Sequence, residues 1–189
     1  MKKIIVTPGV IFCIPLFMPK DDWKLKIKLT EEDLNREFVF GRVIESSSSI
    51  LVEIFNKVGS AYTDIDDIIK SGVMFSPILI FWIGVAQKRW KVIGQTENYN
   101  KIIDSNYNNL KMVFGIGEEY RLKDFETQKE TFIQRTEISK YELSIVWFPI
   151  DLENRIIQKL AANLPERSIS TNCKTIKIKD MEEQEGRMI

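Results

Sequence analysis

The chain has 189 residues, of which 44% are hydrophobic and 29% are charged, a composition typical of a folded globular protein and not of a disordered or fibrous one. Its 27 lysine and arginine residues balance 27 aspartate and glutamate residues, so no net charge draws the whole protein to nucleic acid or to an anionic membrane. Histidine is absent, which excludes histidine-based nucleophilic catalysis and histidine metal sites and leaves carboxylate, lysine, tyrosine or arginine chemistry.

The N-terminal part of the chain predicts two strands and a helical turn. Val10 to Leu16 is rich in β-branched and aromatic residues, which favour a strand. In residues 23–29, WKLKIKL, apolar residues alternate with lysines, so we expect an edge or hairpin strand with its lysines in water. Residues 30–37, TEEDLNRE, predict a helical turn with Thr30 as its N-cap and acidic residues in its first turn.

The N-terminus and the two cysteines favour a cytoplasmic protein. Lys2 and Lys3 before the apolar residues 4–18 resemble a signal peptide, but prolines interrupt this run and no small-residue cleavage site follows it. Cys13 inside the first strand and Cys173 in a polar segment predict two unpaired thiols, which suit a reducing compartment. We therefore expect no export, no disulfide and no zinc site.

The middle of the chain predicts a β-hairpin, a short helix and a further strand. Phe38 to Glu45 and Ile50 to Phe55 have the composition of strands, and the four serines between them that of a turn. Residues 62–72, YTDIDDIIKSG, predict an amphipathic helix that starts near Thr63. Residues 77–87, PILIFWIGVAQ, belong to an apolar run that is too short for a membrane helix and predict a long buried strand.

The C-terminal half predicts more short strands, a polar loop at residues 97–109 and one longer helix. Short strands are expected in five segments: 89–96, 111–117, 120–125, 131–137 and 141–148. The helix is predicted by apolar residues that recur at spacings of three and four: Leu152, Ile156, Ile157, Leu160 and Leu164. Asp151 and Glu153 near its start and Lys159 near its end suit the helix dipole.

These elements predict an α+β protein. We expect a mainly antiparallel, strongly twisted sheet or a partly open barrel, with a C-terminal helix and one or two short helices. Residues 1–164 are expected to form a single domain, because 189 residues are few for two. Residues 165–189 are a polar tail for which partial disorder is expected.

The densest group of carboxylates is Asp64, Asp66 and Asp67, whose spacing could hold magnesium. The helix dipole explains acids at a helix start equally well. GIGEEY, residues 115–120, lacks the third glycine and the following helix of a phosphate loop. A carboxylate-dependent enzyme acting on phosphate esters and a small β-barrel module that binds nucleic acid therefore stay as alternative functions.

A glycine and an arginine interrupt the apolar strand FVFGRVIES, residues 38–46. Gly41 indicates a bulge or a close approach of another group to the backbone. Arg42 has three interpretations: a catalytic arginine, a structural ion pair with an acid at the sheet edge, and part of a family signature.

Five short segments follow one another in a fixed order: PGVIFCIPL at 8–16, FVFGRVI at 38–44, LVEIF at 51–55, RWKVIG at 89–94 and VWFPIDLENRI at 146–156. In this order they resemble the immunity protein 26 family of bacterial polymorphic toxin systems, over residues 8–163. The insertion at 19–37 and the polar tail depart from the family pattern. The signature positions, which we expect to hold the fold, are Phe40, Gly41, Arg42, Trp90 and Gly94.

The resemblance implies a cytoplasmic, non-enzymatic inhibitor that binds and neutralises a cognate toxin domain, with nucleases among the toxins. It implies no cofactor, no membrane contact and no direct binding of nucleic acid. A neutral inhibitor can meet a basic toxin by concentrating its acids, and the alternative contact is an apolar patch around Trp23 or Trp82. The acidic candidates for toxin binding are Glu31, Glu32, Asp33, Asp64, Asp66, Asp67, Glu118 and Glu119.

Overall fold

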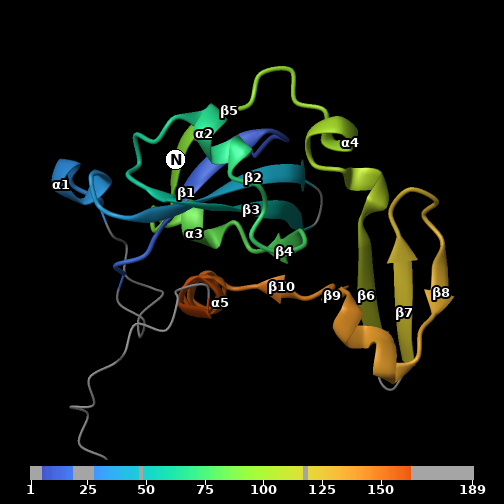
Figure 1. Cartoon of the computed structure of the whole chain (residues 1–189). Helices are drawn as coiled ribbons and strands as arrows, with labels where there is room; N and C mark the ends of the chain where they lie inside the picture. Colours follow the sequence, from blue (N-terminus) through green and yellow to red (C-terminus); the bar gives the residue numbers. More distant parts are fainter. Residues whose placement is uncertain (1–5, 19–27, 47–48, 117–118, 163–189) are drawn as a thin grey trace, which may run out of the picture.

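The computed structural model describes residues 6–18, 28–46, 49–116 and 119–162. These residues form two open β-sheets, and the longest helix, α5 (Pro149–Ala162), lies below the larger sheet in the view of Figure 1. The six-stranded sheet has the order β10 (Val146–Trp147), β4 (Ile78–Ile80), β3 (Ile50–Gly59), β2 (Phe38–Ser46), β1 (Val10–Pro15) and β5 (Lys91–Gln95). The four-stranded sheet has the order β8 (Glu130–Phe132), β7 (Glu119–Asp124), β6 (Lys111–Ile116) and β9 (Glu142–Leu143).

Most neighbouring strands are antiparallel. Among the described strands only β10 with β4 and β6 with β9 pair in parallel. This confirms the predicted α+β class with mainly antiparallel sheets. Each sheet keeps two edge strands, so the sheets do not close into a barrel.

Short helices connect the strands: α1 (Glu31–Leu34), α2 (Ile65–Lys70), α3 (Ile83–Ala86), α4 (Lys101–Asp104) and the 3₁₀ helices η1 (Tyr107–Asn109) and η2 (Arg135–Lys140). Thr30 caps α1 as predicted, since its hydroxyl accepts a hydrogen bond from the Asp33 backbone N–H at 3.2 Å. The amphipathic helix predicted within residues 62–72 is α2. Its N-cap is Asp64, whose carboxylate accepts from the backbone N–H of Asp66 at 2.9 Å.

The predicted long strand at 77–87 is wrong beyond Ile80. There β4 ends, and the chain turns through Trp82 into α3. The turn places the Trp82 ring edge-on against Phe12, with the ring centroids 5.4 Å apart. A short apolar run does not by itself distinguish a buried strand from a buried helix. The expected loop at 97–109 contains α4 and η1.

Three other predicted segments are residues 131–137, 23–29 and 165–189. The strand predicted at 131–137 is confined to β8, and η2 follows it. The alternating segment 23–29 lies outside the described residues except for Lys28 and Leu29. The tail at 165–189 also lies outside them.

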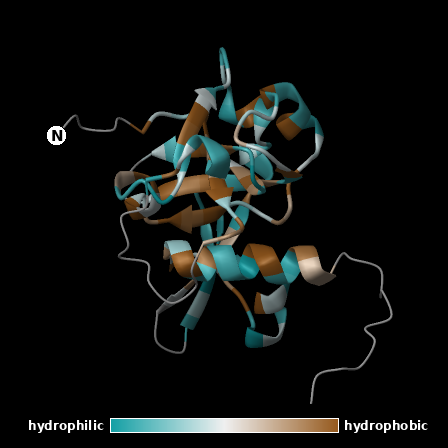
Figure 2. Ribbon diagram, turned by 90° about the vertical axis from the view of Figure 1, so that its left-hand side faces the viewer, coloured by the Kyte–Doolittle hydropathy of each residue, from teal (hydrophilic) through white to brown (hydrophobic). Residues whose placement is uncertain are grey.

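Hydrophobic clusters cover both faces of the larger sheet. On one face Phe12 packs in a cluster with Leu152 of α5. On the opposite face Phe40 packs in a cluster with Leu34 of α1 and Ile68 of α2. Figure 2 shows mostly hydrophobic strands above an α5 that carries both hydrophobic and hydrophilic residues. The sheet is therefore buried between α5 and the pair α1 and α2.

A third hydrophobic cluster joins the two sheets. Its buried members come from β2, β3, η1, β6 and the residue between the last two: Ile44, Leu51, Tyr107, Leu110 and Met112. The position of the smaller sheet therefore depends on the segment that carries α4 and η1.

Gly41 is required by a close approach of a side chain to the backbone. A Cβ atom at this position would lie 2.5 Å from Cζ of Phe12 and 3.0 Å from Cδ1 of Ile54. The register of β2 against β3 also shifts between Val39 and Gly41, which confirms the predicted irregularity in this strand.

We expect Gly41→Ala to lower the free energy of unfolding by about 1–3 kcal/mol, because the added methyl group overpacks the core against Phe12. Chemical denaturation of both proteins measures the loss. The same substitution in a Phe12→Leu background should cost less, since the ring atom that clashes is removed. An equal cost in the two backgrounds would refute this explanation.

Candidate functional site

Arg42 forms a buried ion pair with Glu53 on the neighbouring strand. The two residues lie opposite each other in the register of β2 and β3, and the Arg42 Nε donates to the Glu53 Oε1 at 2.6 Å. Their side chains are only 2% and 3% exposed. The expected partner at the sheet edge is therefore wrong, because β3 lies inside the sheet between β2 and β4.

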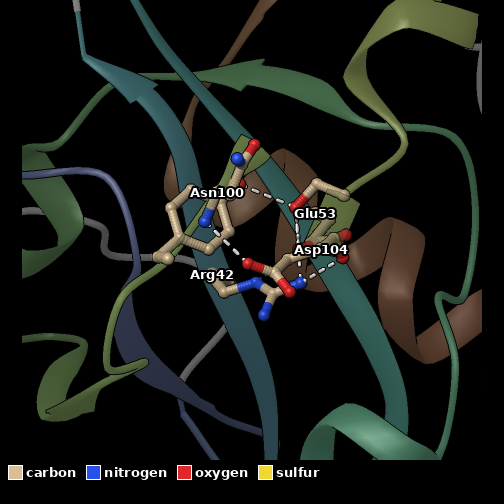
Figure 3. Close-up of polar contacts among 6 residues, drawn as sticks. Arg42, Glu53, Asn100 and Asp104 are labelled. Atoms are coloured by element: carbon tan, nitrogen blue, oxygen red, sulfur yellow. Dashed lines mark hydrogen bonds and ion pairs between the residues drawn. The ribbon is translucent and has the colours of Figure 1, made fainter. Parts of the chain in front are cut away.

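The Arg42 guanidinium also fastens α4 to the larger sheet. Its Nη2 donates to the backbone oxygen of Asp104 at 2.6 Å and to the Ser105 Oγ at 3.3 Å. Figure 3 shows Arg42, Glu53 and Asp104 gathered beside Asn100, the N-cap of α4. The guanidinium therefore binds groups of β3 and of the chain around α4, which favours the structural interpretation of Arg42.

Tyr99, which precedes α4, also contacts Arg42 and Ser105. Its ring lies over the Arg42 guanidinium, with 4.9 Å between Cζ and the ring centroid, and its hydroxyl is 2.7 Å from the Ser105 Oγ. Burial raises the pKa of Tyr99 to about 12, so the phenol stays protonated at neutral pH.

A second buried ion pair fastens α5 to the chain before β5. Arg89 donates from Nε to the Glu153 Oε1 at 2.7 Å and from Nη2 to Oε2 at 2.6 Å. The Trp90 Nε1 donates to the same Oε1 at 2.8 Å, and its ring stacks on Phe12 with the centroids 5.8 Å apart. Trp90, a signature position, thus connects the core of the sheet to α5.

The other signature glycine, Gly94, allows α2 to lie close to β5. A Cβ atom at Gly94 would come within 2.6 Å of Cδ1 of Ile65, the first residue of α2. Phe40, Gly41, Arg42, Trp90 and Gly94 all make contacts between elements of the fold. A structural role for them stays a prediction, which the substitutions of Gly41 above and of Arg42 in the Discussion test at two of the five positions.

The structure brings two of the three acidic clusters together. The Tyr62 hydroxyl, just before α2, donates to the Glu31 Oε2 at 2.7 Å, and the Ala61 N–H donates to the Leu34 oxygen at 2.9 Å. These contacts place α1 next to the start of α2. We call Glu31, Glu32, Asp33, Asp64, Asp66 and Asp67 the α1–α2 acidic surface.

Two acids of this surface accept hydrogen bonds at helix starts: Asp33 in the capping box of α1 and Asp64 as the N-cap of α2. Hydrogen bonds from Thr30 hold the pKa of Asp33 below its ordinary value. Glu32, Asp66 and Asp67 are exposed and form no ion pair within the described part of the chain. They are therefore open to a partner.

The third acidic cluster lies elsewhere. Glu119 begins β7 in the smaller sheet, far from α1 and α2 in Figure 1, and its carboxylate is 3.9 Å from Nη2 of Arg121. Glu118 lies outside the described residues. Within residues 6–18, 28–46, 49–116 and 119–162, no three acidic or cysteine side chains are grouped so that they could hold a metal ion. In the same ranges no helix is long and apolar enough to cross a membrane.

A cleft of about 580 Å³ opens where the segment with α4 and η1 meets the chain between α2 and β4. Its lining includes Glu53, Val73, Phe75, Ile103, Asp104 and Tyr141, and we call it the Glu53 cleft. No sequence pattern described above predicts this cleft. Glu53 is the single polar residue of the predicted strand Ile50 to Phe55, and this lone acid was the available signal.

The comparisons with known proteins give one family. Residues 7–119, which are more than half of the chain and run from the residues before β1 to the start of β7, match the family described as Immunity protein 26. Neither the curated proteins nor the solved structures gave a match.

Proposed function

Because the chain belongs to the immunity protein 26 family, we propose that it binds and neutralises the toxin domain of a cognate polymorphic toxin. In this proposal it works in the cytoplasm and inhibits by binding, without catalysis of its own. The observation that carries the proposal is the family match over residues 7–119, which contains the Arg42 network and both acidic helices.

A nuclease is the toxin class that the α1–α2 acidic surface fits best. Nuclease domains must hold phosphate groups, so their active sites are surrounded by lysine and arginine. Glu32, Asp66 and Asp67 offer exposed carboxylates on adjoining helices to such a surface. Complementary charge of this kind mainly accelerates association.

Co-expression with the product of the neighbouring toxin gene tests the proposed function. We expect the two proteins to copurify and the toxin to lose its activity in the complex. Full toxin activity in the presence of an excess of the folded protein would contradict the proposal.

Reversing two charges tests the proposed contact. We expect Asp66→Lys combined with Asp67→Lys to slow association with the toxin about tenfold at low salt, and to have less effect at high salt. Stopped-flow mixing measures the association rate. Asp64 is retained because it caps α2.

Glu119→Lys is the control for this prediction, because Glu119 is an exposed acid on the smaller sheet, away from α2. It should associate at the wild-type rate. If Glu119→Lys slows association and the α2 variant does not, the contact lies on the smaller sheet. If neither variant slows association, Asp66, Asp67 and Glu119 do not guide the toxin to the protein, and the proposed contact of α2 is wrong.

A further inference from the structure

We propose that the Glu53 cleft receives a lysine or arginine side chain of the partner protein. This inference rests on the proposed function, since the partner is the toxin domain. It assigns a specific cationic contact to a cavity that lies apart from the α1–α2 acidic surface.

The first argument is an unused oxygen on a buried carboxylate. The Glu53 Oε1 accepts from Arg42 at 2.6 Å and from the Ser105 Oγ at 2.7 Å. Its Oε2 accepts no hydrogen bond from the described residues. Since Glu53 lines the cleft, we infer that this oxygen faces the cleft. A charged donor placed there would satisfy this acceptor.

The second argument is the charge balance of the lining. Glu53 is neutralised by Arg42, while Lys111 and Lys140 pair with Asp124 at 3.2 Å and with a neighbouring glutamate at 3.0 Å. Asp104 remains as a carboxylate that forms no ion pair with any described residue; its Oδ2 accepts only from the Asn100 N–H at 2.7 Å. The uncompensated charge of the cleft is therefore negative.

The third argument is the apolar wall above these carboxylates. Ile103 is 78% exposed and Val73 is 50% exposed, and both line the cleft with the half-buried Phe75. Lysine and arginine carry an aliphatic stem that packs on apolar surface while the charged end reaches a polar group. Exposed apolar side chains around a desolvated polar group are also typical of the centre of a protein interface.

The position of the cleft agrees with a shared interface. Val73 follows α2 closely, since α2 ends at Lys70. A wall of the cleft therefore begins three residues after α2, the helix that carries Asp66 and Asp67. A partner that contacts this helix can extend its contact to the cleft.

The first experiment needs no toxin. N-acetyl-arginine methylamide is titrated into the ¹⁵N-labelled protein, and N-acetyl-citrulline methylamide, its neutral isostere, serves as the control probe. We expect saturable shifts of the backbone amides of Ile103, Asp104, Ser105 and Tyr141 with a dissociation constant on the order of 10 mM for the arginine probe only. No saturable shift at these amides, or equal shifts with both probes, would overturn the proposal.

Variants of the cleft then locate the cation. Glu53→Gln keeps an oxygen for Arg42 and removes the charge, so it should abolish the shifts. Asp104→Asn is at an exposed position and should weaken binding of the arginine probe without altering the fold. If Asp104→Asn is folded and binds the probe as wild type does, and a folded Glu53→Gln does too, the cleft does not bind by charge.

The toxin provides the second experiment. Ile103→Ser should raise the dissociation constant of the toxin complex about tenfold, whereas Ile102→Ser should not, because Ile102 is an exposed residue of the same helix that does not line the cleft. Equal affinities for the two variants and the wild type would refute the contact. If the toxin does not bind at all, the proposed function fails, and the arginine titration still decides whether the cleft binds a cation.

Discussion

Glu153→Ala is expected to lower the free energy of unfolding by about 3–5 kcal/mol, because it leaves the buried Arg89 without the carboxylate that holds it. Arg89 and Glu153 are 1% and 5% exposed, so water cannot replace the lost partner at low cost. The substitution also removes the acceptor of the Trp90 indole N–H. Denaturant titration followed by tryptophan fluorescence measures the loss.

Glu142→Ala is the matched control for this prediction. Glu142 binds Arg155 of α5 through two hydrogen bonds of 2.7 and 2.8 Å, donated by Nη1 and Nη2, so this pair is bidentate like the Arg89 pair, in which Nε and Nη2 donate. The Arg155 side chain is 26% exposed, so solvent stabilises it when the carboxylate is removed. We expect a loss of about 1 kcal/mol. Equal losses in Glu142→Ala and Glu153→Ala would show that burial does not set the strength of these pairs.

The sequence predicted α5 from its spacing but not what Glu153 does. Apolar residues at intervals of three and four identify the face that packs on the sheet, and the structure buries Leu152 and Ile156 on that face. For Glu153 the sequence predicts only a favourable interaction with the helix dipole. Its partners Arg89 and Trp90 come from a distant part of the chain, and local spacing carries no information about such a contact.

The hairpin of β2 and β3 was also predictable, and its ion pair was predictable only in part. Strand composition located both strands, and the glycine indicated the irregularity at Gly41. The pairing of Arg42 with Glu53 depends on a register that the irregularity shifts, so sequence alone could not assign the partner.

The Glu53 cleft could not be predicted, for a different reason. One of its sides belongs to the segment for which the sequence predicts a loop, at 97–109, and another leads into the segment for which it predicts a long strand, at 77–87. The cleft exists because α4 is fastened to Arg42 and because β4 ends at Ile80. Both features depend on tertiary contacts, which the local hydrophobic pattern of the sequence does not reveal.

Removing the Arg42–Glu53 pair separates stability from recognition. Glu53→Leu alone is expected to lower the free energy of unfolding by about 3–5 kcal/mol, because Arg42 stays buried without a carboxylate. Arg42→Met in the same chain replaces the pair with apolar side chains of similar size. The double variant should recover most of the loss, since a well-packed apolar pair often matches a buried ion pair in stability. A double variant as unstable as Glu53→Leu would show that the pair is needed for folding beyond its charge.

The double variant, if its stability is recovered, then tests whether the toxin binds in the cleft. It lacks the Glu53 Oε2, which we propose accepts a hydrogen bond from the partner, and it also lacks the Arg42 donors that hold α4 beside the cleft. We expect the double variant to be nearly as stable as the wild type and yet to release the toxin at least tenfold faster, because loss of a buried charged contact acts mainly on dissociation. Wild-type dissociation from a stable double variant would mean that the ion pair serves the fold alone and that the toxin does not reach Glu53.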